Sequence, residues 1–400
     1  MRISTAQINL QATNAMLDQQ AAASKTQLQI SSGRRILTPA DDPVGASRVL
    51  ALSQSVSVTE QFQSNINAAE SKLRLEETAL GSVTNALQRV RELALQGNND
   101  TNTAQDRDAI AVEVRELLDG LLRVANSQDE SGEYLFAGFK TQTQPFSASG
   151  STFSYSGDQG QRLLAVGPGR RIASGDSGFE VFMRIPNGNG TFVASANGAN
   201  TGTGVIDQGS VVTSFVPENY TITITEPTPG DLRYSVTGSV SGAIATNVVY
   251  ADGQAINFGG IGVTLTGTPA AGDSFTVQPS SAQSLFDTVQ AIAAELEAGG
   301  GAPAADALFH TDLGRAISEL DQGLEKILEM RAGAGARLNA LDNQAEINAD
   351  YQLQLQTTLS EVQDLDYAEA ISRFELQLVA LQAAQQSFSR ISGLSLFNFL

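Results

Sequence analysis

The single histidine of the sequence, His310, is the first residue to test for chemistry. A Ser-His-Asp triad could be built only around it, and Asp312 is its nearest acidic neighbour. The residues before His310 are rich in Ala, Pro and Gly, as in a turn that precedes a helix. We therefore expect an exposed histidine near the start of a helix and no catalytic triad.

Two adjacent carboxylates, Asp41 and Asp42, could serve acid/base chemistry or bind a cation. No third ligand lies near them in the sequence. Pro43 follows directly, and an acidic residue before a proline is typical of a helix start, with the acid as the cap and the proline at the first helical position. The pair therefore predicts a helix that begins at Pro43.

Two glycine-rich motifs match ligand-binding loops only in part. Gly259-Gly260-Ile261-Gly262 occurs once and lacks the aspartate of a calcium-binding β-roll repeat. Gly333-Ala334-Gly335 lacks the third glycine of a dinucleotide fingerprint, and no strand precedes it. The sequence also contains no cysteine, which excludes a thiolate nucleophile and a thiolate metal site. We expect no catalytic residue, no cofactor, no metal site and no enzymatic activity.

The charge balance argues against nucleic acid as a partner. The 400 residues include 43 acidic and 24 basic side chains, with a formal net charge of −19, whereas phosphate binding draws on clustered Lys and Arg. No run approaches the roughly 20 apolar residues of a membrane span. Residues Met1 to Gln7 lack the apolar core of a cleaved signal peptide. We therefore expect no membrane segment and, if the protein is exported, a route that needs no cleaved signal.

Long helices are predicted toward both ends of the chain, and they must position His310 and the Asp41-Asp42 pair. All 11 prolines lie at positions 39 and 43 or between 145 and 303, so residues 44–144 and 304–400 can form uninterrupted helices. Two heptad seams, separated by a turn at Gly97 to Asp100, predict an antiparallel helical hairpin, and only Glu76 breaks the first seam. A third seam predicts another long helix. The seams contain Leu73, Leu80, Val83, Leu87, Val90 and Ala94, then Ile110, Val114, Leu117, Leu121 and Val124, then Leu313, Ile317, Leu320, Leu324 and Ile327.

The seams of the two chain ends differ from these three because polar and small residues interrupt them. Gln7, Asn14 and Ser24 share the first seam and Gln385 shares the last, which weakens a coiled coil while it fixes the register. Each terminal helix is expected to be marginal alone and to bury its apolar residues against other subunits. The expected assembly contacts are Ile3, Leu10, Leu17, Leu28, Ile371, Phe374, Leu378, Leu381 and Phe388.

Between the helical tracts the apolar period changes from seven to two. Residues 220–225 and 232–236 alternate apolar with polar side chains, which predicts half-buried strands. Further alternation over 248–277 predicts more strands, with Asp252-Gly253 as a tight hairpin turn. The Gly/Asn-rich stretch from Asn197 to Gly209 is a candidate division between two small β units. We expect the chain to leave and return on the same side of this region, as in an insertion.

The sequence thus predicts a mainly α fold with a central all-β insertion, in which long coiled-coil-like helices from both chain ends form a rod. Residues 1–43 and 361–400 are expected to be terminal assembly helices, and residues 44–143 and 282–360 the helical rod domain. Residues 144–281 are expected to form a β-rich outer domain.

Both ends carry motifs that resemble the bacterial flagellin superfamily. They run from Ser31 to Gly45, from Gly335 to Asn339 and from Asp364 to Glu369, and the resemblance covers roughly residues 1–143 and 282–400. It implies secretion through the flagellar export channel, terminal helices that form the inner tube of the flagellum, and a β part on the outer surface. The residues that carry the match are Ser32, Gly33, Arg35, Ile36, Asp41, Asp42, Pro43, Arg337, Leu338, Asp366 and Tyr367.

Three features within the superfamily resemble the hook-associated protein 3 family. They are the opening Met1 to Thr5, Pro43 where flagellins usually have alanine, and the ending Leu394 to Leu400. This resemblance implies a secreted structural protein of the bacterial flagellum at the junction between hook and filament. The implied partners are hook-associated protein 1, flagellin, further copies of the chain in a ring, and an export chaperone. Flagellin, the filament subunit itself, is the alternative.

Two other classes find no support in the sequence. A hydrolase on the β region would need convergent acid/base or nucleophile pairs there, and none is visible. A coiled-coil adhesin stalk would need one unbroken heptad register and an anchor, whereas the register resets near Gly97.

Overall fold

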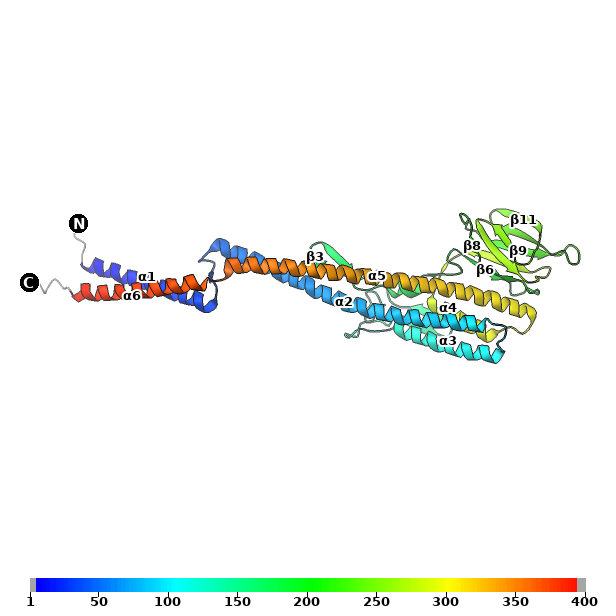
Figure 1. The fold of residues 1–400 in the computed structure, drawn as a ribbon, viewed down its shortest axis with the longest axis horizontal. Helices are drawn as coiled ribbons and strands as arrows, with labels where there is room; N and C mark the ends of the chain where they lie inside the picture. The colour runs from blue at the N-terminus through cyan, green and yellow to red at the C-terminus, as the bar shows by residue number, and fades with distance from the viewer. Residues whose placement is uncertain (1–4, 394–400) are drawn as a thin grey trace, which may run out of the picture. The chain divides into compact units, whose positions relative to one another are not determined.

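A computed structural model describes residues 5–393, which fall into two compact units. The first unit comprises the two chain ends, up to residue 64 and from residue 344, and the second comprises residues 65–343. Two long helices, α2 (Pro43–Gly97) and α5 (Pro303–Gln363), contribute residues to both units (Figure 1). Their length agrees with the absence of proline from these stretches of sequence.

The first unit pairs the two chain ends. Helices α1 (Thr5–Ser32) and α6 (Tyr367–Gly393) lie side by side and run in opposite directions (Figure 1). Each is joined to its long neighbour by a short turn, at residues 33–42 after α1 and at residues 364–366 before α6. The remaining residues of the unit belong to the adjoining parts of α2 and α5.

The second unit contains a group of four helices. The later part of α2 turns at Asn98 to Thr103 into α3 (Ala104–Ala125), which forms the predicted antiparallel hairpin. Thr103 and Asp106 close a capping box at the start of α3, with the Asp106 amide donating to the Thr103 hydroxyl at 3.3 Å. Helix α4 (Leu285–Ala298) precedes α5. The third heptad seam starts only at Leu313 and therefore did not predict α4 as a separate helix.

One hydrophobic core fills the space among these four helices. The heptad residues Leu80, Leu87 and Val90 of α2 are fully buried in it. Phe146, Phe182 and Phe286 add an aromatic cluster, with ring centroids 5.2 to 5.6 Å apart. The helical pattern read from the sequence is therefore the pattern that is buried.

Short β elements pack against this helical core. Two hairpins lie after α3, β1 (Phe146–Ser149) with β2 (Thr152–Tyr155) and β3 (Leu163–Gly167) with β4 (Arg170–Ala173), and a π-helical turn, η1 (Phe179–Met183), follows them. Strand β5 (Ile185–Pro186) then pairs with β15 (Ala282–Gln283), the last strand before α4. The segment between β5 and β15 therefore leaves and returns at neighbouring points, as expected.

That segment forms two antiparallel sheets. The five-stranded sheet has the order β11-β10-β9-β14-β6, and the four-stranded sheet contains β12, β13 and β7, with β8 also paired to β13. The strands are β6 (Phe192–Ala196), β7 (Val205–Ile206), β8 (Ser210–Val211), β9 (Tyr220–Thr225), β10 (Arg233–Gly238), β11 (Gly242–Val249), β12 (Ala255–Phe258), β13 (Ile261–Thr266) and β14 (Ser274–Pro279).

A second hydrophobic core lies inside these sheets and is separate from the helical core. Ile222, Ile224, Val263 and Phe275 are fully buried there, at positions that alternate with polar residues along the strands. The predicted β-rich segment 144–281 thus contributes to both cores, since β1, β2 and η1 supply residues to the helical core and the two sheets formed by β6 to β14 enclose the other.

One predicted strand pairing is wrong. Asp252-Gly253 does not close a hairpin, because β11 pairs with β10 and β12 pairs with β13. Gly253 has the positive φ of +72° that the motif requires, but the turn carries the chain from one sheet to the other. Local turn chemistry fixed the backbone shape here and left the choice of partner strand to the packing of the two sheets.

The fold class predicted from the sequence is confirmed: the structure is mainly α, with helices from both chain ends and a central antiparallel β region. Among residues 5–393, no helix is both long enough and apolar enough to cross a membrane.

Leu121 provides a test of the helical core. It is 1% exposed in the core cluster, so Leu121→Ala is expected to lower the free energy of unfolding by about 3 kcal/mol through lost burial and the cavity left behind. Val112 lies on the same helix and is 60% exposed, so Val112→Ala should change stability by less than about 0.5 kcal/mol. Urea unfolding followed by circular dichroism compares the two, and equal losses would contradict the assigned core.

Candidate functional site

The motifs from the two ends of the sequence meet in the first unit. The Arg35 amide donates to the Gln363 carbonyl at 2.8 Å, and the Leu365 amide donates to the Gly33 carbonyl at 3.0 Å. Arg34 and Asp364 thereby form an isolated antiparallel β-bridge. We call these two joined turns, residues 33–42 and 364–366, the elbow. It places the start of α6 beside the end of α1.

Gly33 permits the tight turn that ends α1. Its φ is +70°, and its amide donates to the Gln29 carbonyl at 2.9 Å, as at a helix C-terminus. A Cβ at this position would lie 2.9 Å from the Tyr367 hydroxyl oxygen. Ser32 adds a hydroxyl bond to the same Gln29 carbonyl at 3.2 Å. Ser32, Gly33 and Tyr367 therefore act together to close the elbow.

Asp41 holds the loop that follows. Its carboxylate accepts the amides of Leu37 at 3.1 Å and Thr38 at 2.9 Å, and the Lys25 ammonium lies 2.6 Å from its other oxygen. The Lys25 hydrogen bond, followed by the Thr38 amide, lowers the pKa of Asp41 to about 2. Asp41 is therefore a charged anchor that ties the loop to α1.

Asp42 starts the next helix. Its Oδ1 accepts the Gly45 amide at 2.8 Å, and Pro43 is the first residue of α2. Arg35 lies 3.6 Å from the other oxygen of the Asp42 carboxylate and also donates to the Val362 carbonyl at 2.8 Å. The prediction of a helix start is confirmed, and both carboxylates of the Asp41-Asp42 pair are engaged within the chain.

The other turn of the elbow is capped in a similar way. Asp366 accepts the amides of Ala368 at 2.9 Å and Glu369 at 3.2 Å, at the start of α6. Ile36 and Leu365, one from each turn, are buried beside these caps. Nine of the eleven residues that carry the family resemblance lie in the elbow or directly beside it, and they are Ser32, Gly33, Arg35, Ile36, Asp41, Asp42, Pro43, Asp366 and Tyr367.

The faces by which α1 and α6 contact each other are made of small and polar residues as much as of large apolar ones. Among the α1 residues whose side chains the structure describes, Ala23, Thr26 and Gln29 are buried. Gln19 of α1 donates to the Gln377 carbonyl of α6 at 3.4 Å. On α6 the less exposed positions follow heptad spacing at Ala370, Phe374, Gln377, Leu381, Ala384 and Phe388. Three of the expected assembly residues, Phe374, Leu381 and Phe388, are thus half-buried.

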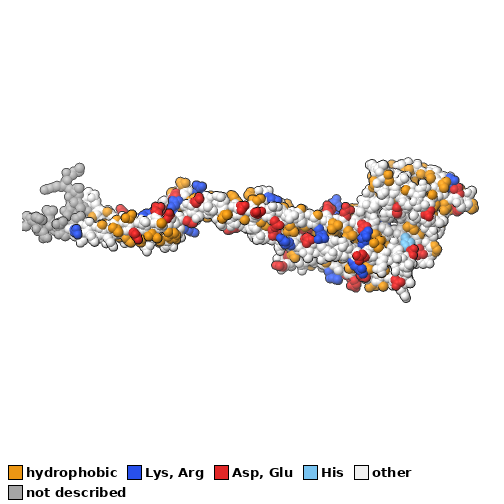
Figure 2. Space-filling view, in the orientation of Figure 1, with side chains coloured by type: hydrophobic (Ala, Val, Ile, Leu, Met, Phe, Trp, Pro, Cys, Tyr) orange, Lys and Arg blue, Asp and Glu red, His pale blue; other side chains and the backbone are white. Residues whose placement is uncertain are grey.

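The opposite faces of the two helices expose large apolar side chains. Leu10 and Leu17 are 63% and 57% exposed, and hydrophobic side chains gather over this pair of helices (Figure 2). The exposed positions include the expected contacts Leu10, Leu17, Leu28, Ile371 and Leu378, and also Leu376 and Val379. Leu376 and Val379 were not among the predicted contacts, because they lie outside the single heptad seam that predicted the contacts of this helix. The remaining expected contact, Ile3, lies outside the described residues.

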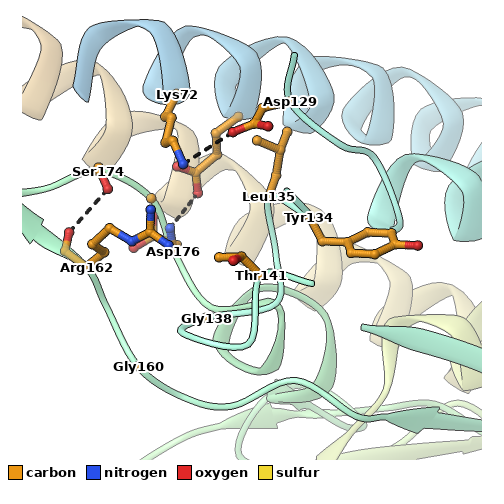
Figure 3. Close-up of a pocket in the computed structure, with 12 residues that line it drawn as sticks. Lys72, Asp129, Tyr134, Leu135, Gly138, Thr141, Gly160, Arg162, Ser174 and Asp176 are labelled. Carbon is orange, nitrogen blue, oxygen red and sulfur yellow. Dashed lines mark hydrogen bonds and ion pairs between the residues drawn. The ribbon is translucent and has the colours of Figure 1, made fainter. Parts of the chain in front are cut away.

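The last two resemblance residues, Arg337 and Leu338, lie in the second unit. Arg337 forms an ion pair with the carboxylate of Asp176, beside a cavity of about 40 Å³. Lys72, Asp129, Arg162 and Asp176 line this cavity (Figure 3). Lys72 pairs with Asp129 at 3.2 Å and with Glu133 at 2.6 Å. The cavity holds room for little more than water, so it offers no site for an organic substrate.

His310 has a structural contact instead of a catalytic one. Its Nδ1 lies 2.8 Å from the Asn98 side-chain oxygen and its Nε2 lies 2.9 Å from Asp100, in the turn between α2 and α3. The side chain is 27% exposed, so the expectation of an exposed histidine is wrong, because α5 packs it against that turn. Asp312 pairs with Arg315. Within residues 5–393 no group of three or more His, Asp or Glu side chains could hold a metal ion.

Comparisons with known proteins agree with this geometry. The model of the bacterial flagellin N-terminal helical region matches residues 3–141. Over 398 residues, covering 100% of this chain and 99% of the relative, the sequence is 28% identical to flagellar hook-associated protein 3 of Escherichia coli (strain K12). Flagellin of Clostridium tyrobutyricum is 36% identical over 135 residues, which cover 33% of this chain and 36% of that flagellin. Similarity to hook-associated protein 3 therefore spans the chain, whereas similarity to flagellin is partial.

Two solved structures from Legionella pneumophila are also similar to this chain. Flagellar hook-associated protein 3 has a TM-score of 0.76 at 37% identity, over 78% of this chain and 98% of that chain. The flagellar junction protein FlgL has a TM-score of 0.72 at 36% identity, over 79% of this chain and 100% of that chain. This chain is thus similar to these two proteins in both fold and sequence.

Gly33→Ala tests the elbow. An L side chain at φ +70° is strained and the Tyr367 hydroxyl must shift, so we expect a loss of about 1 to 2 kcal/mol in local stability. The measurement is amide hydrogen exchange at Arg35 and Leu365, which should become faster. Gly335→Ala is the control, because Gly335 lies inside α5 with open space around it and alanine there favours the helix. Unchanged protection in Gly33→Ala would contradict the role of Gly33.

Proposed function

This chain belongs to the flagellar hook-associated protein 3 (FlgL) family, and we propose that it binds neighbouring subunits of the hook-filament junction through the outer faces of α1 and α6. As a member of that family it is an exported structural component of the bacterial flagellum, located at the hook-filament junction. The exposed apolar side chains of the first unit support α1 and α6 as the surface that contacts the neighbouring subunits.

The observation that carries the proposal is the distribution of apolar residues around α1 and α6. On α1 the small or polar residues Ala23, Thr26 and Gln29 are buried, while Leu10 of α1 and Leu376 of α6 are 63% and 71% exposed. Each Leu or Val side chain that becomes fully buried between subunits stabilises the contact by about 1.5 to 3 kcal/mol. A pair of helices that exposes many large apolar side chains is suited to contacts between subunits, because those side chains are still available for burial.

The proposed partners are of three kinds. Copies of this chain would form a ring through heterologous contacts between the outer face of α1 and that of α6 in the next copy. Hook-associated protein 1 and flagellin would continue the same helical packing on either side of the ring. Before assembly the exposed leucines need a cover, so we include an export chaperone among the partners.

We further infer that the chain has no enzymatic role. The relatives are structural proteins of the flagellum. The one histidine is engaged by Asn98 and Asp100, and the Asp41-Asp42 pair serves the elbow. A purified sample that hydrolysed substrates in a broad hydrolase panel would contradict this inference.

A filament role is the alternative, and seeded polymerisation separates it from the junction role. Flagellins match this chain over part of its length, whereas hook-associated protein 3 matches over the whole length. We expect purified chain to add to hooks that end in hook-associated protein 1 without growing further. Long homopolymers in electron micrographs would support flagellin instead.

Leu376→Asp tests the proposed contact surface. The side chain is 71% exposed in the free chain, so the charge stays hydrated and the melting temperature should change little. In a subunit contact the same carboxylate would be buried without a partner, at a cost of several kcal/mol. We expect non-motile cells that release flagellin into the medium when this variant replaces the wild-type protein.

Val240→Asp is the matched control for that experiment. Val240 is 86% exposed in the β10-β11 turn, so Val240→Asp introduces the same charge at an exposed apolar position that belongs to the β insertion and not to α1 or α6. Leu381→Asp completes the series, because the half-buried Leu381 should affect monomer stability and assembly together. The contact assignment fails if Leu376→Asp and Val240→Asp support motility equally well.

The β insertion between residues 188 and 280 is expected to be dispensable for junction formation. The Asn187 amide donates to the Ser281 carbonyl at 2.9 Å, and the insertion has its own core, so a short Gly/Ser linker can replace it without disturbing the helical core. The shortened protein should still melt cooperatively and retain filaments on cells. Flagellin shed into the medium, with normal melting, would instead assign a junction role to the insertion.

A further inference from the structure

Three segments of the second unit meet at a buried charge cluster. Glu76 comes from α2, Arg337 from α5, and Asp176 from residues 174–178, which connect β4 to η1 and which we call the strap. The Asp176 amide donates to Glu76 Oε1 at 3.1 Å, and its carboxylate forms an ion pair with Arg337. The other Asp176 oxygen accepts from Gln161 at 2.7 Å. These contacts attach the strap to both long helices.

The cluster has buried atoms that lack partners. Glu76 is 2% exposed, and in the part of the chain that the structure describes neither its Oε2 nor Nη1 of Arg337 has a hydrogen-bond partner. Glu76 also lines the cavity of about 40 Å³ beside the strap. An orphaned carboxylate oxygen in a buried site is costly, whereas a protonated carboxyl group can donate a hydrogen bond.

The other charged groups around the cavity are neutralised among themselves. Lys72 of α2 pairs with Asp129 and Glu133, and Arg162 pairs with Glu133 at 3.2 Å. On the other side, Glu77 of α2 pairs with Arg331 of α5 at 2.7 Å. Two carboxyl groups, Glu76 and Asp176, therefore share the single guanidinium of Arg337. The local charge balances only if the two carboxyl groups hold one proton between them.

We propose that Glu76, Asp176 and Arg337 form a proton-dependent latch, in which one proton shared by the two carboxyl groups clamps the strap to α2 and α5. When the proton leaves to water, two carboxylates face one guanidinium in a buried site and repel each other. The strap then separates from α2 while Asp176 keeps its ion pair with Arg337. The latch also gives Arg337, a residue of the family resemblance outside the elbow, a positioning role.

The protonation of Glu76 supports this geometry. Burial is the largest cause that raises the pKa of its carboxyl group, the charge of Asp176 is the next, and the value reaches about 8 against an ordinary 4.5. A folded-state pKa above the unfolded value gives stability that is complete below the unfolded pKa and is lost as the pH rises through the folded pKa. Alkaline conditions near pH 8 to 9 are therefore where the latch should open.

Glu76→Gln tests the latch in the full-length free protein. Glutamine accepts the Asp176 amide and donates to the Asp176 carboxylate, so it imitates the protonated carboxyl group at every pH. The unfolding constant of the wild-type protein should rise about tenfold per pH unit between pH 6 and 8, since only the folded chain keeps the proton. In Glu76→Gln this rise should be absent. Glu77→Gln, beside it on α2 but paired with Arg331, should keep the wild-type slope.

A second measurement distinguishes a latch from a simple titration. Amide hydrogen exchange over residues 174–178, corrected for intrinsic rates, should lose protection at least tenfold between pH 6.5 and 9 in the wild-type protein and stay constant in Glu76→Gln. Parallel stability profiles for the two proteins would overturn the proposal. The proposal would also be overturned if Glu76→Gln changed the pH dependence of stability while the wild-type strap kept the same exchange protection at pH 6.5 and 9. In that case the proton would not hold the strap.

Discussion

A short backbone bridge between residues 33–35 and 363–365 controls how the two chain ends lie in the first unit. Its two hydrogen bonds, 2.8 and 3.0 Å long, leave α1 and α6 side by side from the elbow outward. Asp41 and Asp42 on one turn and Asp366 on the other satisfy the amides that such sharp turns leave without partners. With the bridge in place, the register of α1 against α6 is set, and so is the choice of which residues face outward.

The limited apolar contact between α1 and α6 follows from that register. Buried Thr26 and Gln29 contribute less hydrophobic free energy than leucines would, while Leu10, Leu17 and Leu376 remain on the surface of the pair. Long helices gain most of their stability from packing of an apolar face. On α1 and α6, the face that would gain the most hydrophobic free energy from burial is the exposed face, which remains free to contact other subunits.

The second unit differs, because its helices bury most of their apolar seams in a core, with Leu117, Val124 and Leu324 partly buried at its edge. Leu80, Leu87 and Val90 meet the aromatic cluster around Phe286 in one core, and the β insertion closes a separate core of its own. The exception is Glu76, a carboxyl group inside the seam, which is tolerated because Asp176 and Arg337 approach it. The same stretch of α2 thus carries both apolar core residues and a buried carboxyl group that burial favours in its protonated form.

The sequence alone determined the features that depend on neighbours within a few residues or on a regular period. The helix start at Pro43 and its Asp42 cap were predictable because a cap bonds amides within three residues, and the long helices and alternating strands followed from their periods. The tertiary structure decided everything that joins distant segments. Asp252-Gly253 was misassigned because a turn motif does not specify its partner strand. Leu381 proved half-buried and Leu376 exposed because a helix with apolar residues on two faces does not reveal which face its neighbour covers. The break in the heptad seam at Glu76 was visible in the sequence, but its meaning depends on Asp176 and Arg337, which only the folded chain brings to it.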